Sequence, residues 1–138
     1  MTDTWEPRPV PEVNPETEAF WRAASDGEFL LSACDDCGLV FHYPRSLCPD
    51  CFSEDVDWQQ AAGTGTIYSY SVSESVSGWP EDGLPLVIAY VELDEGPRVM
   101  TNVQDVDPDD VEVGLAVEAR FVPTEEENVA VPVFVPAE

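Results

Sequence analysis

The 138-residue chain contains no lysine, a single histidine and only five basic residues, all of them arginines, against 29 acidic residues. Its net charge of −24 argues against a protein that binds a phosphate backbone, because such proteins need a basic surface. The acids are spread along the chain, and molar salt shortens the Debye length to about 3 Å and relieves repulsion between like charges. We therefore expect adaptation to a salty cytoplasm, as in halophilic archaea. The alternative is an acidic surface that mimics nucleic acid or docks a basic partner.

Long apolar segments are also missing. No stretch approaches the roughly 20 apolar residues that a membrane-spanning helix needs, so no membrane association is expected. Residues 1–11 are polar and rich in proline, without the basic and apolar regions of a secretory signal. We expect a cytoplasmic protein, and in that compartment paired cysteines are more often metal ligands than disulfides.

The residues of a catalytic centre are lacking as well. His42 is the only histidine and each of the four cysteines belongs to a closely spaced pair, so no Ser-His-Asp or Cys-His set can be assembled. The chain has neither a phosphate-binding loop nor the glycine motif of dinucleotide-binding proteins. Carboxylates are too abundant for any pair to be informative. These absences predict a protein that is not itself an enzyme.

What the chain does have is the spacing C-x2-C-x10-C-x2-C, formed by Cys34, Cys37, Cys48 and Cys51. A two-residue spacing lets a tight turn direct both sulfurs to one ion, and two such turns complete a tetrahedral site. This pattern favours zinc with a structural role, because four thiolates leave no open position. Iron in the same sulfurs, serving electron transfer, is the alternative. His42 lies between the pairs and is expected at the surface or behind the ligands rather than on the metal.

Three regions are predicted. Residues 1–27 form an N-terminal arm with a helix that Asn14 caps, Pro15 begins and Gly27 ends. Its apolar side, with Phe20 and Trp21, packs either on the rest of this chain or on a partner. Residues 28–60 form the zinc ribbon, and residues 61–138 a small barrel.

The third region is mainly β. Five strands are expected, with a one-turn helix signal at Asp107–Gly114 between the third and fourth, which is the element order of an OB-fold barrel. Residues 86–93 are nearly all apolar, which predicts a strand buried on both faces. Pro132 and Pro136 indicate that the last strand lies at an edge.

A few residues are candidates for binding an acyl-CoA ligand. Arg45 and Arg98 could each grip a phosphate or pair with a nearby carboxylate. Aromatic rings could stack on an adenine or else belong to the core and rim of the barrel. The aromatic candidates are Tyr68, Tyr70, Trp79 and Tyr90.

Taken in order, four segments resemble the zinc-ribbon plus OB-fold proteins associated with acyl-CoA metabolism. They are FWRAASDGEFLLSACDDCGLVFHYPRSLCPDC (20–51), GTGTIYSYSV (63–72), LVIAYVELDEGPRVMTNV (86–103) and VGLAVEARFVP (113–123). The resemblance implies a rubredoxin-like ribbon with the four cysteines as zinc ligands, and a non-catalytic scaffold or accessory subunit. It also implies a thiolase-like enzyme as partner, in some archaeal members together with hydroxymethylglutaryl-CoA synthase. The scarcity of cations departs from the family's basic ribbon.

Overall fold

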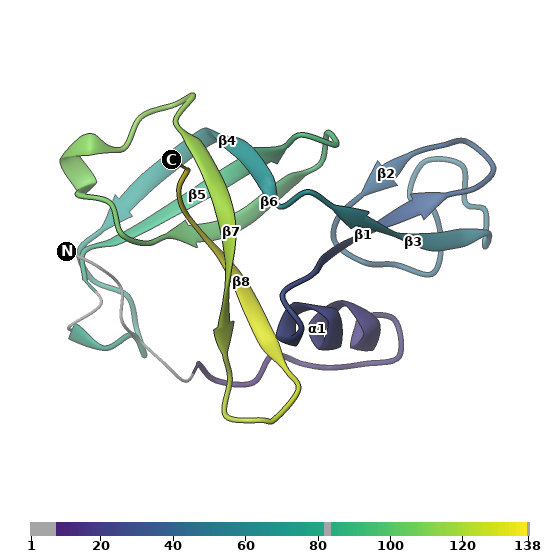
Figure 1. Cartoon of the computed structure of the whole chain (residues 1–138), viewed down its shortest axis with the longest axis horizontal. Helices are drawn as coiled ribbons and strands as arrows, with labels where there is room; N and C mark the ends of the chain where they lie inside the picture. Colours follow the sequence, from purple (N-terminus) through teal and green to yellow (C-terminus); the bar gives the residue numbers. More distant parts are fainter. Residues whose placement is uncertain (1–7, 82–83, 138) are drawn as a thin grey trace.

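A computed structural model describes residues 8–81 and 84–137 and shows a mainly β protein with two lobes (Figure 1). The smaller lobe is a three-stranded sheet in the order β2-β1-β3, and the larger is a closed barrel in the order β4-β5-β6-β8-β7. The elements are α1 (Glu18–Ser25), β1 (Phe29–Cys34), β2 (Val40–Phe41), β3 (Val56–Ala61), β4 (Thr64–Ser73), β5 (Leu86–Leu93), β6 (Arg98–Val103), the 3-10 helix η2 (Pro108–Asp110), β7 (Ala116–Pro123) and β8 (Ala130–Pro136). Five barrel strands with η2 between the third and fourth confirm the predicted OB-fold.

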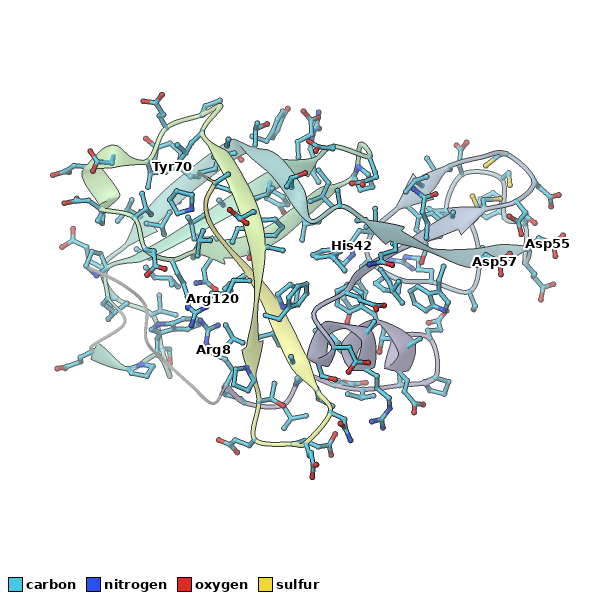
Figure 2. All side chains as sticks on the ribbon, viewed as in Figure 1. Arg8, His42, Asp55, Asp57, Tyr70 and Arg120 are labelled. Carbon is cyan, nitrogen blue, oxygen red and sulfur yellow. The ribbon has the colours of Figure 1, made fainter. Side chains whose placement is uncertain are left out.

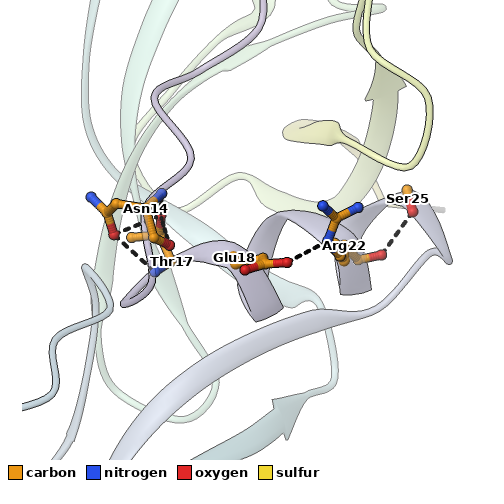
Figure 3. A network of polar contacts seen from close by, with 5 residues as sticks. All are labelled: Asn14, Thr17, Glu18, Arg22 and Ser25. Carbon is orange, nitrogen blue, oxygen red and sulfur yellow. Dashed lines mark hydrogen bonds and ion pairs between the residues drawn. The ribbon is translucent and has the colours of Figure 1, made fainter.

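Helix α1 begins three residues later than the proline signal predicts. Asn14 caps a preceding turn, because its side-chain oxygen accepts a hydrogen bond from the amide of Glu16 (3.0 Å). The same oxygen accepts a second one from the amide of Thr17 (3.1 Å), as Figure 3 shows. The predicted end at Gly27 is confirmed. Gly27 has φ +83°, and its amide and that of Glu28 bond back to the helix carbonyls of Ala24 and Ala23, which is a Schellman ending.

The apolar side of α1 is buried inside the molecule. Phe20 is 2% exposed and Trp21 is 8% exposed, and the helix packs against β1, β7 and β8. Phe20 meets Phe29 nearly at right angles, with ring centroids 5.6 Å apart. These two rings therefore pack on their own chain, and the alternative that they dock on a partner is not what the structure shows.

Strand β5 differs from its prediction. Its inner residues are buried, but Tyr90 is 46% exposed and Ile88 and Glu92 are half-buried, so only one face lies in the core. The prediction that this apolar strand is buried on both faces is therefore wrong. Strand β4 has an irregular register beside β5 between Ile67 and Ser69, and this bulge interrupts the simple alternation of its side chains.

The barrel closes weakly at one seam. Strands β6 and β8 are joined by the single parallel pair Val103 and Phe134, whereas β7 and β8 pair along the whole length of β8. The expected edge position of this last strand is wrong, because β8 lies between β6 and β7 in the closed barrel. Its two prolines, which cannot donate to a neighbouring strand, are accommodated because β8 has only one residue pair with β6. Within the described residues, no helix is long and apolar enough to cross a membrane.

Replacing Gly65 by Ala should test the close approach of β4 to β5 at this glycine. An added Cβ would lie 2.4 Å from the carbonyl oxygen of Glu92 and 3.0 Å from the Cα of Leu93. Backbone atoms in two hydrogen-bonded strands cannot move aside easily, so we expect a loss of about 1–3 kcal/mol in the free energy of unfolding. Urea denaturation measures it, with the exposed neighbour Thr66→Ala as control. Equal stability of the two variants would contradict the close approach.

Candidate metal centre

The four cysteines come together at the tip of the smaller lobe, where Figure 2 shows their sulfurs. The Sγ atoms all lie within 4.8 Å of one another. Cys34 and Cys51 are 3.6 Å apart and Cys37 and Cys48 are 3.7 Å apart, sulfur to sulfur. A tetrahedron with zinc–sulfur bonds of about 2.3 Å has edges of about 3.8 Å. The sulfurs therefore have the separations of a four-thiolate metal site.

Two copies of one backbone turn place these sulfurs. The amide of Cys34 donates to the carbonyl of Leu39 (2.8 Å), and the amide of Cys48 donates to that of Ser53 (2.9 Å), five residues on in both cases. Gly38 and Phe52 follow the second cysteine of each turn, and both have positive φ, +81° and +63°. Glycine at position 38 adopts this backbone without strain, whereas a phenylalanine at position 52 gives no sign of a left-handed backbone in the sequence.

Amide groups in these turns point toward the sulfurs. The amide of Cys37 lies 3.5 Å from the Cys34 sulfur, and the amide of Asp50 lies 3.4 Å from the Cys48 sulfur. Without metal, amides of Cys51 and Asp50 lower the pKa of Cys48 to about 7, against the effect of burial. Although the Ser53 amide lowers the pKa of Cys51, burial and the three neighbouring thiols raise it to about 12. A metal that binds here must displace protons, so binding weakens as pH falls.

The donor set fits a closed metal site. Four thiolates at tetrahedral separations suit zinc, and four-sulfur zinc sites are structural because no position remains for water or substrate. The turn amides would stabilise the negative charge that thiolates place around the ion. In chemical terms the site can cross-link β1 to the loop after β2, but it offers no Lewis acid to a substrate.

The residues expected to contact a ligand do not form one site. Arg98 lies over the ring of Tyr68, 3.8 Å from its centroid, and its Nε is 3.4 Å from a carboxylate oxygen of Glu92. Tyr70 lies elsewhere on β4 and is 42% exposed. Tyr90 lies on the outer face of β5 and is 46% exposed, and the remaining two candidates, Trp79 and Arg45, line separate hollows. Two roles were expected for Arg98, binding a phosphate or pairing with a carboxylate, and the structure shows the second.

Two matches to known families cover most of the chain. Residues 21–57 match the rubredoxin-like zinc ribbon domain of ChsH2, and residues 58–122 match the ChsH2 C-terminal OB-fold domain. A DUF35 domain-containing scaffold protein of Methanothermobacter thermautotrophicus is 39% identical over 82% of this chain and 86% of its own length. The chain belongs to the ChsH2/DUF35 family.

Two further similar proteins are named as an enzyme or as part of one. A solved structure titled Ltp2-ChsH2(DUF35) aldolase aligns with a TM-score of 0.81 and 35% identity, over 93% of this chain and 99% of that one. A probable enoyl-CoA hydratase alpha subunit of Thermomonospora curvata is 37% identical over 94% of this chain. This chain spans only 40% of the length of that subunit. The family is thus linked to acyl-CoA metabolism, and its members include proteins named as scaffolds.

His42 differs from its prediction. It lies between the two lobes and apart from the sulfurs (Figure 2), with its ring 5.4 Å from that of Phe20 and 6.0 Å from that of Phe29. Burial lowers the pKa of His42 to about 4, so the ring is neutral at pH 7. Its Nδ1 has no hydrogen-bond partner among the described residues. His42 is therefore a partly buried residue packed among aromatic rings at the junction of the two lobes, and it lies apart from the metal ligands instead of supporting them.

Arg8 was not singled out from the sequence, because a lone arginine in a polar arm carries no signal of burial. The structure makes it only 7% exposed and places its guanidinium 4.9 Å from the centre of the Trp79 ring. Its amide donates to the carbonyl of Pro123, and its carbonyl accepts from Glu125. These contacts hold the start of the described chain beside β7.

Substitutions at Gly38 and Phe52 should shift ribbon stability in opposite directions. Nothing lies within 4 Å of a Cβ at Gly38, so Gly38→Ala costs only the left-handed backbone, about 1–2 kcal/mol. Phe52→Gly relieves the same backbone strain, and the side chain that it removes is 70% exposed. We therefore expect the free energy of unfolding to rise by up to about 1 kcal/mol. Chelator competition and thermal melting measure both. If the two variants shift together, the two turns are not equivalent.

Proposed function

We propose that this DUF35 protein is a non-catalytic accessory or scaffold subunit of an acyl-CoA-processing complex. The observation that carries the proposal is the alignment of nearly all of this chain with nearly all of the chain in the Ltp2-ChsH2(DUF35) aldolase structure. That structure is an aldolase named for Ltp2 together with a DUF35 chain. The sequence adds that this chain has no nucleophile and base pair, and the four-sulfur geometry adds no open metal position.

The metal in the proposal is structural zinc, with Cys34, Cys37, Cys48 and Cys51 as ligands. Support comes from the separations of their sulfurs and from the match of residues 21–57 to a zinc ribbon domain. Zinc bound there would stabilise the two turns and, through β1, the position of the smaller lobe. In small modules of this kind the free energy of metal binding is folding free energy.

The partner in the proposal is a thiolase-like enzyme in the cytoplasm, with hydroxymethylglutaryl-CoA synthase as a further member of the complex. The relative from Thermomonospora curvata carries this chain's sequence pattern within a longer hydratase subunit, which supports a position beside enzymes that act on CoA thioesters. Acyl-CoA itself is proposed as a ligand of the assembled complex. Of the six candidate contacts, Trp79 lines a hollow whose other walls are mostly apolar.

Purification of the tagged protein from its native cells in molar salt tests the proposal. We expect an acyl-CoA enzyme in near-equal amount, identified by mass spectrometry, and one zinc per DUF35 chain in a colourless preparation. The physical reason is that a scaffold subunit binds its enzyme in fixed stoichiometry, whereas chance binding to a polyanion weakens in high salt.

The control is Cys34→Ser, which should lose zinc and the smaller lobe because it leaves only three thiolates. Recovery of the chain alone would remove the accessory role. A red preparation containing iron would indicate an electron-transfer site instead of structural zinc. Recovery of nucleic acid would favour a nucleic-acid-binding protein, the class that the net charge argues against.

We further propose that the protein is of the halophilic archaeal type. With a net charge of −24, repulsion among carboxylates destabilises the compact state in dilute buffer. The melting temperature should therefore rise by several degrees between 0.1 M and 2 M KCl, as the Debye length shortens from about 10 Å to a few ångströms. A melting temperature that is flat or falls over this range would contradict salt adaptation.

A further inference from the structure

An apolar groove follows the weak seam between β6 and β8. Two hollows, with volumes of about 560 Å³ and 310 Å³, meet there and share Met100, Val131 and Pro132 as walls. The larger continues over Ile88 on the outer face of β5, and the smaller continues to Trp21 on α1. Because only one residue pair joins β6 to β8, the side chains along this seam are not covered by a neighbouring strand.

The groove is distinguished by its lack of acidic residues. Of the described residues that line the two hollows, none is an aspartate or glutamate, although the chain has 29 acidic residues. The other three hollows all have carboxylates in their walls, for example Glu127, Asp57 and Glu118. An apolar group can therefore enter the seam without stripping water from a carboxylate, and this is a condition that those three hollows do not meet.

Aromatic side chains border the groove at both ends. At one end Trp79 is a wall residue, and the guanidinium of Arg8 stacks on its ring. At the other end Trp21, Tyr43 and His42 are wall residues. The imidazole of His42 is neutral because burial lowers its pKa to about 4. The walls thus offer mainly apolar contact, with Arg8, Thr101 and Asn102 as the polar residues of the larger hollow, and the volumes are in the range of small-molecule sites.

We propose that this groove binds the apolar acyl group of a CoA thioester, with a chain of about eight carbons or more, while the CoA part remains outside the seam. This inference rests on the proposed function, since the family's link to acyl-CoA enzymes is what selects a thioester among apolar ligands. A short polar acyl group such as acetyl or acetoacetyl would leave most of the walls exposed to water. The groove thus assigns the protein to bulky, hydrophobic thioesters. A thiolase-like partner is compatible with this assignment, whereas the hydroxymethylglutaryl-CoA synthase of the proposed complex, which handles short polar acyl groups, is not accounted for by the groove.

Calorimetric titration of the full chain in 2 M KCl with acetyl-, hexanoyl-, octanoyl- and decanoyl-CoA tests the assignment. The dissociation constant should fall by about fourfold for each methylene that enters the groove. Met100→Glu should weaken octanoyl-CoA binding at least tenfold, because it places a carboxylate in the acid-free wall. Met100→Leu should preserve binding.

The matched control is Val113→Glu, since Val113 and Met100 are both 64% exposed and Val113 does not line either hollow. Equal binding of all four thioesters, no binding of any, or equal weakening by both glutamates would overturn the assignment. Copurification of the enzyme partner with Met100→Glu separates the two proposals. If the partner is retained while length dependence is absent from the wild type, the accessory role stands and the acyl groove falls. Loss of the partner without any length dependence would make the groove a protein contact instead.

Discussion

The packing of three phenylalanine rings holds the two lobes and the helix of this protein together. Phe29 is the first residue of β1 after the helix. The centroid of its ring lies 5.6 Å from that of Phe20 and 6.2 Å from that of Phe134 on β8. An eight-residue helix is not stable alone in water, and a two-lobed chain of this size buries little core in either lobe. The position of the ribbon beside the barrel therefore depends on this junction, and so does the placement of His42 and Trp21 at one end of the seam.

Much of the fold was predictable because its signals are local. Cysteine spacing, the Gly27 stop and the Asp107-Pro108 cap each act within a few residues, and the structure has the corresponding sulfur cluster, helix end and 3-10 helix. The predictions that failed concern tertiary packing, that is, which face of a strand or helix is buried and against what. The run at residues 86–93 carries no sign that one face would remain outside the barrel. The aromatic pair on α1 likewise could not distinguish its own chain from a partner.

The candidate ligand residues show the same limit. Arg98 was selected because cations are scarce, and Tyr68 and Trp79 because aromatic rings can stack on an adenine, but the sequence cannot say which of these side chains converge. Arg98 and Tyr68 contact each other on one part of the barrel, whereas Trp79 is joined by Arg8, which carried no signal at all. The groove itself arises from a missing strand pairing and from the positions that acids avoid. Both are properties of the folded surface, and neither is a motif.

The single pair between β6 and β8 also sets how the barrel comes apart. Separating these strands breaks almost none of the ladder that joins the others, so the lowest-energy opening of the barrel should run along this line. Backbone amides flanking it will exchange with solvent through that local opening, while amides in the β4–β5 pair wait for a larger unfolding event. Any molecule that bridges the seam would restrain this motion. Binding of a ligand along the seam should therefore slow amide exchange in β6 and β8, in addition to filling the groove between them.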